Sequence, residues 1–140
     1  MQVDCIIPAH EKDFETLGLA IQSIREKCPE VTRLIVVSKS KWIGCEEAGA
    51  EALDEASELF PFKLEDLKDL GATPGWLLQQ LLKLYAPLVV PEISERVLVC
   101  DADVVWVKPT RFIKDAGGAQ PKCFSCTYSA EACPPIRSMV

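Results

Sequence analysis

The stretch Val3-Asp4-Cys5-Ile6-Ile7-Pro8 decides the fold that this sequence predicts. It is short, rich in β-branched residues and ended by a proline, which is typical of a strand buried on both faces of a parallel sheet. After a polar loop, apolar residues recur with helical spacing between Asp13 and Cys28, just before Pro29. This spacing predicts an amphipathic helix, so the chain opens with a strand, a loop and a helix.

A second β-branched run, Leu34 to Val37, completes a strand–helix–strand unit of the length that a parallel crossover requires. The acidic, alanine-rich stretch from Glu46 to Leu59 predicts a further helix, and Phe60-Pro61-Phe62 predicts a short third strand. Alternating strands and helices of this kind predict an α/β domain. We expect a Rossmann-like, mostly parallel sheet with helices on both faces.

Thr73 and Pro74 are suited to begin a helix, which we expect to end at about Ala86, before the next proline. Arg96 to Cys100 then predicts another buried strand. Its carboxyl end leads into Asp101-Ala102-Asp103, and ligands of open α/β sheets bind at the carboxyl ends of the strands. We therefore expect the chemistry at this tripeptide.

The 140 residues are 49% hydrophobic and 26% charged, which is enough apolar material for one compact core but not for two. We expect one domain over residues 1–116, followed by an irregular tail with cysteines and prolines over residues 117–140. Unpaired edges of a short sheet would favour pairing of two copies, so a homo-oligomer is one possible assembly.

The net charge of −6, without any basic stripe, argues against nucleic-acid and anionic-membrane partners. No apolar run approaches the roughly 18 residues of a membrane span, and the first residues are not basic. We expect a cytoplasmic protein without a membrane span.

Of the seven cysteines, Cys5 and Cys100 lie inside apolar runs, where a reduced thiol packs as a small hydrophobe. Cys123, Cys126 and Cys133 would give a zinc ion three ligands, whereas a closed site needs four.

Asp101 and Asp103 place two carboxylates one residue apart where the chain leaves a strand. Such hard oxygen ligands select Mg²⁺ or Mn²⁺, and the cation can neutralise a diphosphate as a nucleotide leaves. A solvated turn without a ligand is the alternative interpretation of the same residues.

The segment Val97-Leu98-Val99-Cys100-Asp101-Ala102-Asp103-Val104-Val105 resembles the D-x-D segment of GT-A glycosyltransferases. The opening from Val3 to Asp13 resembles that fold's first strand and nucleotide-contacting loop. The helix Gly75-Trp76-x-x-Gln79-Gln80-x-x-Lys83-Leu84 is similar to the helix before the D-x-D in a bacterial-type branch of these enzymes. Order and spacing agree over residues 3–112, so the resemblance implies the nucleotide-binding half of a GT-A fold, truncated after the D-x-D.

This resemblance implies a nucleoside-diphosphate-sugar donor, a UDP- or GDP-sugar, and transfer of its sugar to an unknown acceptor. Asp103 would be the firmer metal ligand, and Asp101 would contact the metal or the ribose. The nucleoside would lie against Pro8, Ala9 and His10, although His10 is also typical of a polar loop without a ligand.

Many of these enzymes carry an acidic residue near the base or ribose after the second strand, whereas this chain has Ser38-Lys39-Ser40 there. Glu65 or Asp66 would have to substitute for it.

Gln79, Gln80 and Lys83 share one face of the expected helix. If this face meets the donor, Lys83 would pair with a phosphate and a glutamine would bind sugar hydroxyls. A solvated stripe is the alternative.

Two other functions compete with glycosyl transfer. The chain could be a catalytically inactive GT-A remnant that acts as a nucleotide-binding or interaction module, because a fold without its site supplies no activity. An apolar strand followed by D-x-D-x-V also matches the first motif of haloacid-dehalogenase-type phosphatases, in which Asp101 would be the nucleophile.

Overall fold

The structure of the chain, a computed structural model, describes residues 2–116 and 119–123, and the side chains of residues 2–113. It divides into two compact units, Met1–Thr110 and Arg111–Val140. The division therefore precedes the boundary expected after residue 116. Each unit is described by itself below.

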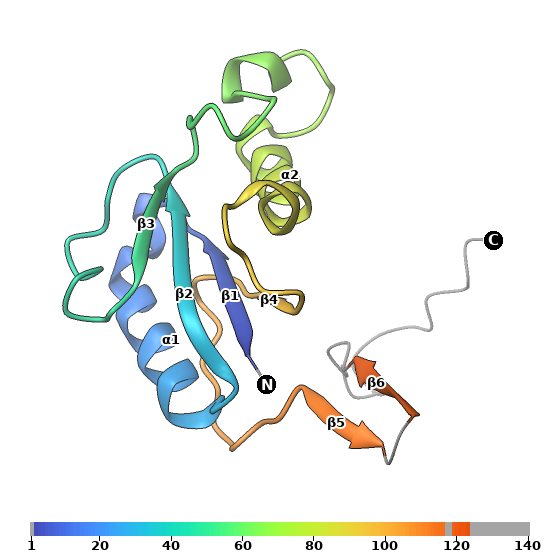
Figure 1. Cartoon of the computed structure of the whole chain (residues 1–140). Coiled ribbons are helices and arrows are strands. Elements are labelled where there is room, and N and C mark those ends of the chain that lie inside the picture. Colours follow the sequence, from blue (N-terminus) through green and yellow to red (C-terminus); the bar gives the residue numbers. More distant parts are fainter. Residues whose placement is uncertain (1, 117–118, 124–140) are drawn as a thin grey trace, which may run out of the picture. The chain divides into compact units, whose positions relative to one another are not determined.

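The first unit is built on one four-stranded sheet in which all neighbouring strands are parallel. Its strands are β1 (Val3–Pro8), β2 (Val31–Ser38), β3 (Glu51–Asp54) and β4 (Val97–Val99), in the order β3-β2-β1-β4 (Figure 1). Ile6 of β1 lies opposite both Ile35 of β2 and Val99 of β4. The predicted parallel sheet is confirmed, with the opening strand between its two expected neighbours.

Two helices, α1 (Phe14–Lys27) and α2 (Pro74–Val89), cover opposite faces of this sheet (Figure 1). Successive side chains of a strand point to opposite faces, so each buried strand serves both helices. The residues packed with α2 are Ile6, Ile35 and Val37. The intervening residues must point to the other face, which α1 covers, and they are buried there: Cys5, Ile7, Leu34 and Val36.

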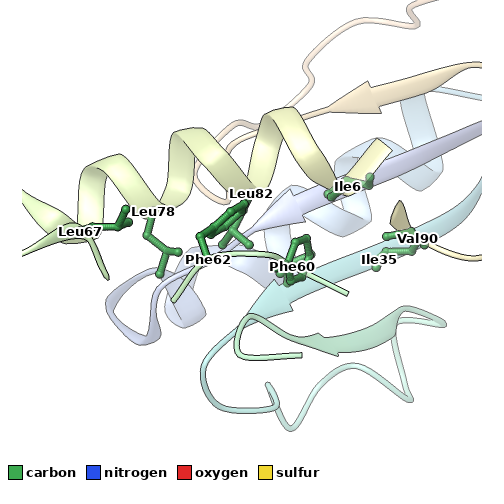
Figure 2. Close-up of a cluster of buried hydrophobic side chains, with 10 residues drawn as sticks. Ile6, Ile35, Phe60, Phe62, Leu67, Leu78, Leu82 and Val90 are labelled. Atoms are coloured by element: carbon green, nitrogen blue, oxygen red, sulfur yellow. The ribbon is translucent and has the colours of Figure 1, made fainter. Parts of the chain in front are cut away.

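The core beneath α2 joins this helix to β1 and β2 (Figure 2). Leu78, Leu82 and Ala86 recur at four-residue intervals and form the buried stripe of the helix. Phe60 and Phe62 enter the same cluster from the loop before the short helix η2 (Leu64–Leu67). Burying each such side chain contributes roughly 1.5–3 kcal/mol, so the position of α2 over the sheet is firmly fixed.

The prediction for the middle of the chain was wrong. Residues 46–59 do not form a helix but contain turns and β3, and Phe60-Pro61-Phe62 forms no strand. β3 is an exposed edge strand, so it needs no apolar alternation, and its Glu51 pairs with Arg33 of β2. Helix propensity is a weak preference that such tertiary contacts override.

The bounds of two predicted elements, α2 and β4, also differ. α2 continues through Pro87 to Val89, because a proline in the last turn removes only one hydrogen bond and the amide of Val90 still donates to Ala86 O at 3.1 Å. Thr73 precedes the helix as expected, but its side chain makes no capping hydrogen bond. β4 is shorter than the predicted strand at residues 96–100.

The second unit contains the antiparallel strands β5 (Ile113–Ala116) and β6 (Ala119–Cys123), with Ile113 opposite Cys123. β6 lies within the segment that was expected to be an irregular tail. Residues 117–118 and 124–140, and with them Cys126 and Cys133 of the zinc alternative, lie outside the described residues. Within the described part of the chain, no helix is long and apolar enough to cross a membrane.

Candidate functional site

Four loops leave the sheet at the same edge, because all four strands are parallel. His10 follows β1, Lys39 follows β2, Glu55 follows β3 and Asp101 follows β4. Backbone hydrogen bonds continue the ladder just past the strand ends. They run from Ala9 N to Val37 O, from Glu55 N to Ser38 O and from Cys100 N to Ile6 O, at 2.9, 3.1 and 3.0 Å. The loops therefore start at one level and form the candidate site.

The Asp101-Ala102-Asp103 tripeptide forms a turn in which Ala102 is buried and both aspartates are exposed. Thr16 Oγ1, near the start of α1, donates to Ala102 O at 3.4 Å and to Asp13 O at 3.0 Å. Anchoring the middle residue directs the two flanking carboxylates towards solvent. The turn is thus positioned by its backbone, with its acidic groups available to a ligand.

Lys83 of α2 reaches across to this turn. Its Nζ lies 2.5 Å from Asp101 Oδ1, and the side chains are 24% and 55% exposed, respectively. The neighbouring Leu82 is in the core under α2, which fixes the backbone from which Lys83 extends. Gln79 and Gln80, predicted on the same face, are half-buried. The structure therefore joins two predicted site residues, Lys83 and Asp101, in a direct ion pair.

His10 is exposed and begins the short helix η1 (Glu11–Asp13). Its Nδ1 accepts a hydrogen bond from Lys12 N at 3.2 Å, and its own amide donates to Asp13 Oδ2 at 3.4 Å. This reciprocal cap orients the imidazole at the edge of the sheet. Pro8 and Ala9, also predicted to line a nucleoside, are buried.

Glu55 belongs to this edge, and sequence analysis missed it. Burial raises the pKa of its carboxyl group above the ordinary value, the Asp54 charge adds to this, and the charges of His10 and Lys39 oppose it. Glu65 and Asp66, the expected substitutes, are part of η2. Had a strand been predicted at residues 51–54, Glu55 would have been expected at its carboxyl end. The sequence of this segment predicted a helix instead.

The donor atoms at the edge suit a shared cation better than a cation held by protein alone. Among the described residues, no three histidine, cysteine, aspartate or glutamate side chains form a group that could hold a metal ion. Mg²⁺ is usually held by one or two carboxylates together with water and substrate phosphates. Asp101 and Asp103 fit that pattern, because both are exposed and both offer hard oxygen ligands.

Buried thiols lie directly beneath the site. Cys100 precedes Asp101, and its thiol lies against that of Cys5 of β1. The hydrogen bond from Cys5 lowers the pKa of Cys100, whereas the same contact and burial raise the pKa of Cys5. Both are free and buried, as predicted for thiols that pack as small hydrophobes.

Comparison of the chain with protein-family models finds no match, and comparison with curated proteins finds none either.

Proposed function

We propose that this chain binds a nucleoside-diphosphate sugar, a UDP- or GDP-sugar, through Mg²⁺ or Mn²⁺ at the carboxyl edge of its sheet, and transfers the sugar to an acceptor. One observation carries the proposal. The two exposed carboxylates of the Asp101–Asp103 turn follow β4, next to β1 and its His10 loop, and Lys83 extends to the same turn. This arrangement combines metal ligands, a cation for phosphate and a loop for the nucleoside.

The carboxylates of Asp103 and Asp101 would hold the cation. Asp103 is the firmer ligand, because among the described residues it has no ion pair, whereas Asp101 is paired with Lys83. A bound Mg²⁺ or Mn²⁺ would neutralise charge on the diphosphate as it leaves the sugar. Lys83 would add a compact positive charge for a phosphate oxygen, and Gln79 or Gln80 hydrogen bonds to sugar hydroxyls.

The nucleoside would lie on the loop after β1. Its backbone is held by the bond from Ala9 N to Val37 O and by the His10 cap, so the loop is already ordered for a flat ring or ribose. Glu55 gives this end of the site an acidic group able to accept hydrogen bonds from hydroxyls. In this proposal, Glu55, which follows β3, would serve in place of the acidic residue expected after the second strand.

Isothermal titration with UDP and GDP, each with and without Mn²⁺, tests the binding step. Wild-type protein should bind a nucleoside diphosphate only with the cation, because two carboxylates repel the phosphates unless a cation lies between them. Asp103→Ala should abolish this binding and Asp103→Asn should weaken it. Glu95→Ala is the matched control, since Glu95 is exposed and precedes β4 at the other edge of the sheet.

The transfer step is tested by incubating the protein with UDP- and GDP-sugars and Mn²⁺ and measuring released nucleoside diphosphate. Water can replace the missing acceptor, so slow release that is lost in Asp103→Ala supports the proposal. Hydrolysis of simple phosphate esters, lost in Asp101→Asn, would instead support the phosphatase alternative. Metal-dependent binding without release would favour the inactive nucleotide-binding module, and metal-independent binding unaffected by Asp103→Ala would refute the proposal.

A further inference from the structure

The ion pair between Lys83 and Asp101 conflicts with metal binding at Asp101. The ammonium lies 2.5 Å from Oδ1, one of the two oxygens that a cation would use. A divalent cation bound to the same carboxylate would lie close to this ammonium, and two like charges at such short range repel strongly. Lys83 and the cation therefore compete for Asp101.

The structure also indicates which partner can move. The backbone of Lys83 is fixed, because Leu82 and Ala86 of the same helix are fully buried against β1 and β2. The Asp101 turn is fixed by the bond from Cys100 N to Ile6 O and by the Thr16 contact at Ala102. What remains free is the four-carbon stem of Lys83, whose ammonium can swing to another acceptor without any movement of α2.

We propose that Lys83 is the resident counter-ion of Asp101, that a divalent cation displaces it, and that the released ammonium then binds the phosphates of the incoming ligand. This inference rests on the proposed function. In the free protein Lys83 neutralises Asp101 and lowers affinity for the cation alone. With a diphosphate present, the lysine has a second anionic partner, so cation and nucleotide favour each other's binding.

The test measures Mn²⁺ binding alone, UDP binding alone, and UDP binding at saturating Mn²⁺, by isothermal titration of wild type and Lys83→Met. Exposed ion pairs contribute up to about 1 kcal/mol, so Lys83→Met should bind Mn²⁺ alone about threefold to fivefold more tightly than wild type. The same variant should bind UDP in the presence of Mn²⁺ about tenfold more weakly, because a charge-assisted bond to phosphate is lost. Opposite changes in these two affinities would show that Lys83 exchanges its partner, from Asp101 in the free protein to phosphate in the complex.

Two further variants separate charge from position. Lys83→Arg keeps a cation beside Asp101, so its affinity for Mn²⁺ alone should stay near that of wild type. Lys68→Met removes the same charge from an exposed residue that has no ion pair within the described residues, and it should leave both affinities unchanged. Thermal unfolding followed by circular dichroism establishes that each variant is folded.

The outcomes distinguish this inference from the proposed function. If wild type binds UDP with Mn²⁺ but Lys83→Met binds Mn²⁺ alone no more tightly, the exchange is refuted and the metal-dependent site stands. If Lys83→Met binds Mn²⁺ alone more tightly yet binds Mn²⁺ and UDP together as well as wild type does, the transfer of Lys83 to phosphate is refuted. If wild type itself does not bind UDP with Mn²⁺, the proposed function fails.

Discussion

Arg33 of β2 donates two parallel hydrogen bonds to Glu51 of β3, from Nε to Oε1 at 2.7 Å and from Nη2 to Oε2 at 2.8 Å. The same guanidinium donates to Pro91 O at 3.1 Å, and its Nη1 lies 3.8 Å from Oδ2 of the buried Asp4. One side chain thus joins β1, β2, β3 and the loop after α2. Such a planar, bidentate contact cannot be reproduced by lysine.

We expect Arg33→Met to lower the free energy of unfolding by about 1–3 kcal/mol, because it leaves the buried Asp4 carboxylate without its neighbouring cation. Arg33→Lys should lie between wild type and Arg33→Met, since it keeps the charge but loses the paired hydrogen bonds. Urea unfolding followed by circular dichroism measures both. An unchanged midpoint in Arg33→Met would show that the contact contributes nothing to stability.

The Arg33–Glu51 contact should also make stability depend on pH. The hydrogen bond from Arg33 lowers the pKa of Glu51 below its ordinary value of 4.5. The folded state therefore binds this proton less readily than the unfolded state does. The resulting stabilisation is fully present above pH 4.5 and disappears as the pH falls through the lowered pKa.

Comparing wild type with Glu51→Gln from pH 7 to pH 3 tests this dependence. The Glu51 side chain is 55% exposed, so solvent screening limits the difference at pH 7 to less than about 1 kcal/mol. The difference should shrink on acidification. A difference that grows towards pH 3 would contradict the assigned direction of the shift.

The Trp42 ring fills the space that a side chain at residue 44 would occupy, so this position requires glycine. A Cβ built at Gly44 would overlap Cζ2 of the Trp42 ring, and the same ring lies 3.6 Å from the position of a Cβ on Gly18. We expect Gly44→Ala to displace this ring from α1 and to destabilise the protein by about 1–2 kcal/mol. Tryptophan fluorescence and urea unfolding report the two effects.

Gly75 provides the control, because nothing lies within 4 Å of a Cβ built there and the residue belongs to the first turn of α2. Gly75→Ala should raise stability by up to about 1 kcal/mol, since alanine is the better helix former. Equal effects of the two substitutions would show that the Trp42 contact is not the cause.

Cys28 should react slowly with alkylating reagents while the protein is folded. Burial raises its pKa to about 11, so very little thiolate exists at pH 8. We expect alkylation of Cys28 by iodoacetamide at pH 8 to be at least about tenfold slower in buffer than in urea. Peptide mass spectrometry measures the rate at this residue, and equal rates in both solvents would contradict its burial.

Much of the sheet could be predicted, because β1 and β2 are buried on both faces and their sequences are almost continuously apolar. β3 could not be predicted in this way. It is an exposed edge strand whose Glu51 forms an ion pair with Arg33 of β2. Its assignment depends on a contact between residues 18 positions apart, which local pattern does not contain.

The residues of the candidate site could likewise be predicted where they follow a predicted strand, and not where they follow β3. Asp101, Asp103 and His10 could be placed at one edge of the sheet because each directly follows a strand that the sequence predicted. Glu55 was missed because its position depends on β3. The sequence placed Lys83 and Asp101 in the same site, but it did not predict the ion pair between them. That direct contact depends on how α2 crosses the sheet.

The bond from Cys100 N to Ile6 O has a consequence for hydrogen exchange. It ties the residue before Asp101 to a strand in which every residue is buried, so this amide can meet solvent only when β4 separates from the centre of the sheet. Its protection factor should therefore report the opening free energy of β4 from the core rather than local fraying of a loop. A ligand that binds the Asp101–Asp103 turn should slow exchange at Cys100, which offers a readout of occupancy that requires neither turnover nor a labelled ligand.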